Sequence, residues 1–194
     1  ENDLLGSAFN ANSLSSVQSN DVLLALPSDF DRDGVQDLLI MGSSSIYWYK
    51  GAISAVGGDF QTSFSSMGVV TGTNSDGAPK SVEIADFNGD GYDDFVVSFS
   101  NTKIKWFANN KDNTFSAGDE IASTEVRPNA IEYLNVGDLN GDLQPDIFGV
   151  FPAENKLVWY ANTGSSDAAR FDGNSSIIIN DPNVLKSPRK SKLV

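Results

Sequence analysis

Three short loops rich in Asp and Asn hold the residues best suited to chemistry in this sequence. Each loop spans nine positions, with an oxygen-bearing side chain at positions 1, 3, 5 and 9. Alternate side chains of a tight loop can turn onto one point, where carboxylate and amide oxygens are ligands that Ca²⁺ prefers. The side chains are Asp29, Asp31, Asp33 and Asp37 in loop 1, Asp86, Asn88, Asp90 and Asp94 in loop 2, and Asp138, Asn140, Asp142 and Asp146 in loop 3.

Such loops are electrostatically unfavourable without a cation. Two carboxylates about 4 Å apart repel by about 4 kcal/mol at an effective dielectric constant near 20. A metal-free alternative exists, because Asp, Asn and Gly are also the residues that tight turns favour. Three copies in register favour metal binding over that alternative. The sequence therefore predicts about three Ca²⁺ sites, and loop 1, with four carboxylates, is expected to bind most tightly.

The loops differ from the EF-hand, which shares their opening pattern. An EF-hand needs a bidentate Glu at position 12 and a helix on each side. Position 12 is Ile40, Val97 and Gly149 in the three loops, so that ligand is missing. The flanking residues alternate like strands or run short and apolar, as in 81–85 and 95–97. These features exclude the EF-hand.

Composition limits the chemistry further. The sequence has no Cys and no His, which excludes disulfides, thiol chemistry, ordinary Zn sites and His-based acid–base catalysis. We therefore expect a protein that is not an enzyme. A formal net charge of −13 argues against nucleic-acid binding. No apolar run reaches the length of a membrane span.

The segments around the loops repeat in the same order. Loop starts lie 57 and 52 residues apart, and Trp48, Trp106 and Trp159 follow them by 19, 20 and 21 residues. Four strands of about five residues plus turns fill such a period, which is the size of a β-propeller blade. No segment has helical periodicity over a useful length. We expect an all-β chain of about three four-stranded antiparallel blades, part of a larger or oligomeric propeller.

The expected organisation follows from these units. Residues 1–20 form an N-terminal strand or loop, and the tail at 181–194 is a partial strand with basic residues. The three blades between them are expected at 21–75, 76–127 and 128–180.

The unit resembles the FG-GAP/VCBS repeat of integrin α subunits and many surface proteins. The matching features are the Asp-x-Asp/Asn-x-Asp loops, the apolar strand after each and the Trp-Tyr or Trp-Phe strand, especially 159–164. The resemblance implies a β-propeller whose loops bind Ca²⁺ through these side chains and through the position-7 backbone carbonyls of Val35, Tyr92 and Gln144. Position 6 departs from the pattern at Leu143, where the other loops have Gly. If that residue is left-handed, Leu costs about 1–2 kcal/mol relative to Gly.

The expected function is a Ca²⁺-binding module for protein binding, adhesion or assembly. We expect it outside the cell or at the cell surface, because extracellular modules of this kind bind Ca²⁺ with dissociation constants of about 10⁻⁴–10⁻³ M. The alternatives are a lectin, or the accessory propeller of a larger extracellular enzyme. For a lectin the Trp residues would stack on sugars, although packing between blades is the favoured interpretation. Asp93 is expected to be solvated, and Asn174 is a candidate glycosylation site.

Three blades are too few to close a propeller of four to eight blades. The end blades would then expose apolar faces, which favours association. We expect either further blades in a longer chain, or copies that join into a ring or filament.

Overall fold

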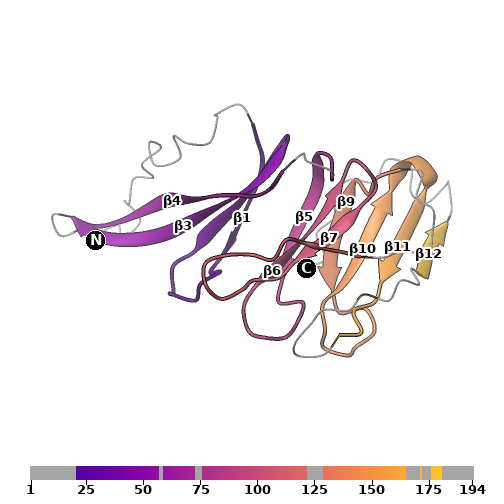
Figure 1. The fold of residues 1–194 in the computed structure, drawn as a ribbon. Helices are drawn as coiled ribbons and strands as arrows, with labels where there is room; N and C mark the ends of the chain where they lie inside the picture. Colours follow the sequence, from indigo (N-terminus) through magenta and orange to yellow (C-terminus); the bar gives the residue numbers. More distant parts are fainter. Residues whose placement is uncertain are drawn as a thin grey trace, which may run out of the picture.

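The computed structural model describes residues 21–56, 59–72, 76–121, 129–164, 171 and 176–180. In this part of the chain the strands form three four-stranded antiparallel sheets, with the orders β1-β2-β3-β4, β5-β6-β7-β8 and β12-β11-β10-β9. We call these sheets blade 1, blade 2 and blade 3. They follow one another in space as they do in the sequence (Figure 1). The predicted all-β fold with four strands in each unit is confirmed.

Each blade is a meander in which consecutive strands pair. The strands of blade 1 are β1 (Val22–Ser28), β2 (Asp37–Gly42), β3 (Ser45–Val56) and β4 (Asp59–Gly72). Those of blade 2 are β5 (Pro79–Ala85), β6 (Asp94–Phe99), β7 (Ile104–Phe107) and β8 (Asp119–Glu120). Those of blade 3 are β9 (Tyr133–Gly137), β10 (Asp146–Phe151), β11 (Lys156–Tyr160) and β12 (Ser176–Asn180). The one helical element in the described residues is a 3₁₀ turn, Pro152–Glu154, so none of them forms a helix able to cross a membrane.

The third strand of blade 1 and the fourth strand of blade 2 differ most from expectation. The sequence predicts a third segment of blade 1 that ends at Gly51, whereas β3 continues to Val56 and pairs along its length with β4. In blade 2 a strand expected over 114–121 is reduced to β8 and one isolated bridge between Asn109 and Phe115. Residues 52–55 of β3 and both residues of β8 are exposed, so hydrophobic pattern sets the length of these segments only weakly. Residues 1–20 and 181–194, with the strands expected there, lie outside the described residues, and the blade boundaries stay predictions.

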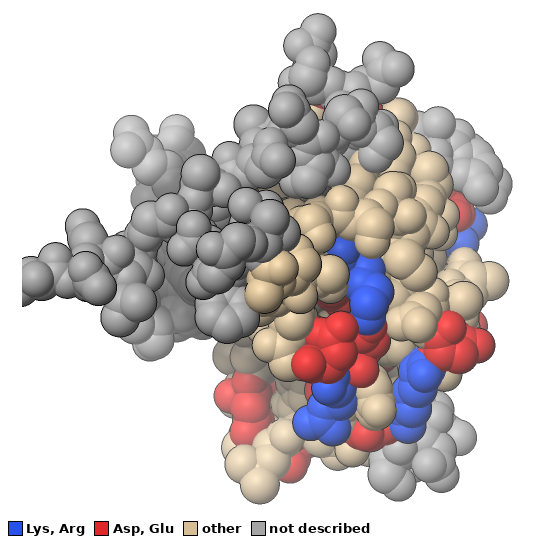
Figure 2. All heavy atoms as spheres, turned by 90° about the vertical axis from the view of Figure 1, so that its left-hand side faces the viewer, with Lys and Arg blue, Asp and Glu red and all other residues tan. Residues whose placement is uncertain are grey.

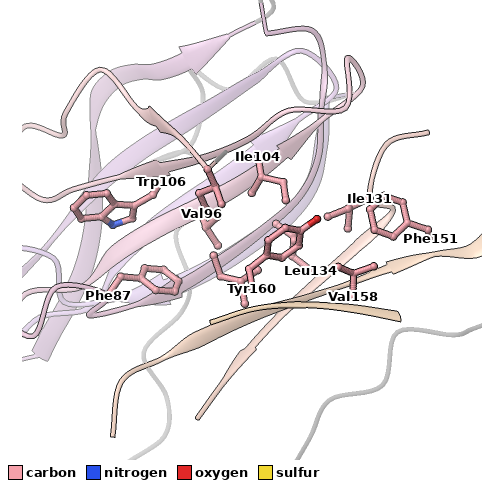
Figure 3. Close-up of a cluster of buried hydrophobic side chains, with 11 residues drawn as sticks. Phe87, Val96, Ile104, Trp106, Ile131, Leu134, Phe151, Val158 and Tyr160 are labelled. Carbon is pink, nitrogen blue, oxygen red and sulfur yellow. The ribbon is translucent and has the colours of Figure 1, made fainter. Parts of the chain in front are cut away.

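The core lies between the blades, where apolar side chains of one sheet pack on the next. On β2 and β3, Leu39 pairs with Trp48, and the same pairing recurs as Val96 with Trp106 and Phe148 with Trp159. We call the side of each blade that carries its Trp the forward face. The forward face of blade 2 packs on Tyr160, Val158 and neighbouring residues of blade 3 (Figure 3). The forward face of blade 1 packs on blade 2 in the same way.

Burial changes at the last blade. Trp48 and Trp106 are 3% and 6% exposed, which confirms their predicted packing between blades, but Trp159 is only half-buried. Loop position 2 is more decisive: Phe30 and Phe87 are each 1% exposed, and their counterpart Leu139 is 42% exposed. The forward face of blade 3 is therefore less covered than the forward faces of blades 1 and 2. Its residues are Leu139, Phe148, Val150, Leu157 and Trp159.

How well the forward face is covered determines how much stability is lost when the side chain at loop position 2 is shortened. Phe30 packs edge-on against Trp48 and Phe115, at ring-centroid distances of 5.9 and 5.2 Å. We expect Phe30→Ala to lower the free energy of unfolding by about 3–5 kcal/mol, because it leaves a cavity between blades. The matched variant Leu139→Ala should cost less than about 1 kcal/mol. Chemical denaturation measures both, and equal costs would show that Leu139 is covered as Phe30 is.

Candidate metal sites

The three acidic loops connect the first two strands of their blades and lie at the same edge of the stack, the lower one in Figure 1. In loop 1 the structure gathers Asp29, Asp31 and Asp33, with one carboxylate oxygen of each within 4.8 Å of the others. Ca²⁺ holds oxygen ligands at about 2.3–2.6 Å, so oxygens in one coordination sphere lie within about 5 Å of each other. The loop 1 carboxylates fit a Ca²⁺ ion by this test.

Backbone N–H groups fix the carboxylate at position 1 in every loop. Asp29 accepts hydrogen bonds from the N–H groups of positions 5 and 6, Asp33 at 3.0 Å and Gly34 at 2.9 Å. Loops 2 and 3 repeat both bonds to Asp86 and Asp138. Despite some desolvation, the backbone donors of loop 3 hold the pKa of Asp138 below its usual range.

Position 6 is left-handed in all three loops. The φ angles are 87° at Gly34, 88° at Gly91 and 69° at Leu143. Leu143 therefore has the left-handed conformation that the sequence analysis considered for it, and its side chain is 92% exposed. Leu143 bears the backbone strain of this conformation without burying its side chain.

Position 5 and position 7 are linked in the same way in each loop. The N–H groups of Val35, Tyr92 and Gln144 each donate to the position-5 carboxylate at 2.9 Å. This turn holds the backbone at position 7, where the family resemblance implies a carbonyl ligand, and the ligand role itself stays a prediction. The Tyr92 ring also lies near two cations, with Arg32 and Lys111 at 5.2 and 5.5 Å from its centroid.

Lysine ammonium groups and an amide group contact the carboxylates of loops 1 and 2. The Lys50 ammonium contacts Asp31 and lies 2.9 Å from Asp33, so it offsets part of the charge of loop 1. In loop 2 Asp90 accepts a hydrogen bond from the Asn88 amide at 2.9 Å and pairs with Lys111 at 3.2 Å. Figure 2 shows such contacts of acidic and basic side chains on the face at the left of Figure 1. Lys50 opposes the tight binding predicted for loop 1, and its counterparts in the other two blades are Ala108 and Ala161.

The carboxylates at position 9 lie in the protein interior. Asp37, Asp94 and Asp146 are each 0% exposed. In each blade this carboxylate accepts the N–H of loop position 2 and the N–H of the third residue after the Trp. The pairs of donors are Phe30 and Gly51, Phe87 and Asn109, and Leu139 and Asn162.

These bonds make position 9 a structural centre of the blade. Asp94 has a further donor, because Trp106 Nε1 lies 3.1 Å from Oδ2. Burial raises the pKa of Asp94 to about 7 and raises that of Asp37 as well, against the hydrogen bonds that favour the charged form. The loop 1 cluster consists of positions 1, 3 and 5. The ligand role predicted for position 9 stays a prediction.

The sequence analysis did not predict three residues that make hydrogen bonds between blades. Asp93, expected to be solvated, instead accepts a hydrogen bond from the Ser28 hydroxyl of blade 1 at 2.5 Å, so that expectation was wrong. Asn109 and Asn162 are buried and reach the loop of the preceding blade. Their signal in the sequence is an Asn three residues after the Trp in two of the three units. Asn174 lies outside the described residues.

A stack of four-stranded blades, each with an acidic loop between its first two strands, defines a β-propeller-type repeat module. A family model described as the FG-GAP-like repeat matches residues 29–97 and 86–149, which together span more than half of the chain. The chain belongs to the FG-GAP-like repeat family. No curated protein matches the chain.

The position-9 carboxylate should matter even without a metal. Asp94→Ala leaves three buried N–H groups without their acceptor, and each costs about 1–3 kcal/mol. We expect the free energy of unfolding in a chelator to fall by at least about 3 kcal/mol. The control is Asp90→Asn in the same loop, which keeps an acceptor for the Tyr92 N–H and should stay within about 1 kcal/mol of wild type. Denaturant titrations in chelator measure the free energy of unfolding of both variants. An Asp94→Ala protein as stable as wild type would contradict the structural role of position 9.

Proposed function

We propose that this protein is a Ca²⁺-binding β-propeller-type module that works outside the cell in protein binding, adhesion or assembly. The observation that carries the proposal is the convergence of the loop 1 carboxylates to a distance that matches a Ca²⁺ coordination sphere. Loops 2 and 3 have the same backbone hydrogen bonds, with an Asn at position 3.

The residues of each loop have separate parts in this proposal. Position 1 is held by backbone donors, so its carboxylate is oriented before an ion arrives. Position 5 closes the turn through the N–H of position 7, and Asn88 and Asn140 present an amide oxygen when they rotate toward the ion. Bound Ca²⁺ supplies positive charge that offsets the repulsion between carboxylates and ties the loop positions together. In loop 1 the Lys50 ammonium has to withdraw from Asp31 and Asp33.

An extracellular location and a role other than catalysis are part of the same proposal. Affinities typical of extracellular modules match the calcium concentration outside cells. The sequence offers no His or Cys for acid–base or thiol chemistry. A lectin function has less support, because Trp48 and Trp106 are buried between blades.

We propose that the forward face of blade 3 takes a further repeat of this family. The forward faces of blades 1 and 2 are each covered by the following blade. On the forward face of blade 3, Leu139 is 42% exposed. Blade 1 of a second copy fits poorly there, because it has Gly51 where blades 2 and 3 have Asn109 and Asn162. A Cβ atom at Gly51 would lie 2.2 Å from the carbonyl oxygen of Gln36.

Calcium should stabilise the module measurably. With a dissociation constant of about 0.1 mM at each site, about 1 mM Ca²⁺ adds about 1.4 kcal/mol per site, or about 4 kcal/mol for three sites. We expect a higher Tm in Ca²⁺ than in chelator by thermal unfolding. The control with Asp33→Asn, Asp90→Asn and Asp142→Asn should lose most of this difference. A wild-type Tm that does not respond to Ca²⁺ would contradict the proposal.

The forward face of blade 3 should promote weak self-association when its natural occupant is absent. Light scattering at micromolar protein and millimolar Ca²⁺ should give an average mass that rises with concentration. Leu139→Lys places a charge on this face and should reduce the rise. Leu23→Lys is a matched control, since Leu23 is 61% exposed on β1 of blade 1. A wild-type protein that stays monomeric, or an equal effect of both variants, would contradict this use of the face.

A further inference from the structure

A buried asparagine of blade 2 holds the acidic loop of blade 1. The Asn109 side chain is 6% exposed, and its amide nitrogen donates to the carbonyl of Phe30 at 2.8 Å and to that of Asp93 at 3.1 Å. The side-chain oxygen accepts the N–H of Lys111 at 2.9 Å, which fixes the direction of the amide. The Asn109 side chain therefore joins loop 1 to loop 2 by hydrogen bonds.

Blade 3 repeats the arrangement on loop 2. The Asn162 side chain is 0% exposed and donates to the carbonyl of Phe87 at 2.7 Å and to that of Pro145 at 3.3 Å. Its oxygen accepts the N–H of Gly164 at 3.1 Å. In both cases the acceptors are position 2 of the preceding loop and position 8 of the blade's own loop. Because the same geometry occurs in two blades, we infer that this contact is a regular feature of the repeat.

The contact acts on the peptide between two proposed metal ligands. Phe30 stands at position 2, between Asp29 and Asp31. Its N–H is held by Asp37 of its own blade at 3.2 Å, and its carbonyl is held by Asn109 of the next blade. The orientation of this residue sets where positions 1 and 3 point. The docked blade thus contributes to the geometry of the loop without touching the proposed ion.

We propose that Asn109 and Asn162 are positioning residues that couple Ca²⁺ binding in loops 1 and 2 to docking of the blade that follows each loop. The inference rests on the proposed Ca²⁺ binding. Coupling free energies are reciprocal, so an ion in loop 1 strengthens the contact between blades 1 and 2 as much as that contact strengthens ion binding. Loop 3 reaches full affinity when an occupant of the forward face of blade 3 supplies an Asn to the carbonyl of Leu139.

The test measures Ca²⁺ affinity loop by loop. The backbone amide NMR signals of Gly34, Gly91 and Leu143 stand at position 6 of loops 1, 2 and 3 and report on each loop during a Ca²⁺ titration. We expect Asn109→Ala to weaken binding about tenfold at loop 1, a typical size for coupled sites. Binding at loop 3 should change by less than about twofold. Asn162→Ala should weaken loop 2 about tenfold and leave loop 1 within about twofold.

Two further variants separate coupling from general damage to the fold. Asn110→Ala removes an exposed neighbouring amide and should leave all three affinities unchanged. Asn109→Ser keeps a hydroxyl that can accept the Lys111 N–H but does not span the two carbonyls. It should reproduce the loss at loop 1 if the Ala variant does not fold.

Each outcome has one meaning. A wild-type protein that binds no Ca²⁺ at any loop overturns the proposed function, and the inference with it. Wild-type binding with unchanged affinities at loop 1 in Asn109→Ala or Asn109→Ser and at loop 2 in Asn162→Ala overturns the coupling alone. An equal loss at all three loops in either variant also overturns it, because the asparagine would then act through overall stability.

Discussion

The buried carboxylate at loop position 9 is the interaction on which each blade depends. In all three blades it accepts the N–H at position 2, at 3.0–3.3 Å, and the N–H of the third residue after the Trp, at 2.8 Å. These two bonds tie the start of the loop to its end and to the exit of the Trp strand. Burying a charge without such partners is costly, so the sequence must supply both donors in every repeat. The shape of the acidic loop and the register of the forward face follow from this requirement.

The second constraint is charge. Backbone donors gather the carboxylates at positions 1 and 5, which is unfavourable unless positive charge lies nearby. In loop 1 Lys50 supplies part of that charge, and in loop 2 Lys111 does. Lys50 contacts two carboxylates of its loop and Lys111 contacts one, and both are monovalent, whereas a divalent ion could bind several oxygens of a loop at once. The carboxylates, the left-handed position 6 and the interblade asparagines make the loops and the blade contacts one connected system.

Much of the fold could be predicted because the sequence repeats. A strand, an acidic loop, an apolar strand and a Trp strand recur in order, and local pattern is sufficient to place such elements. The contacts between blades could not be predicted in this way. Asp93 reaches Ser28 across 65 residues and Asn109 reaches Phe30 across 79, distances that local pattern does not encode. The contact of Lys50 with loop 1 could not be predicted from the repeat, because only blade 1 has a cation two residues after the Trp. The length of β3 likewise depends on its pairing with β4, which the local pattern does not fix.

The central claim is that the three loops bind Ca²⁺, and the number of ions bound to the intact chain tests it most directly. Isothermal titration calorimetry on metal-free protein counts the sites without reference to stability or association. We predict about three Ca²⁺ ions per chain, with dissociation constants in the range of extracellular modules, about 10⁻⁴–10⁻³ M. The triple variant with Asn at position 5 of each loop should lose this binding. Absence of binding by the folded wild-type chain at millimolar Ca²⁺ would contradict the account.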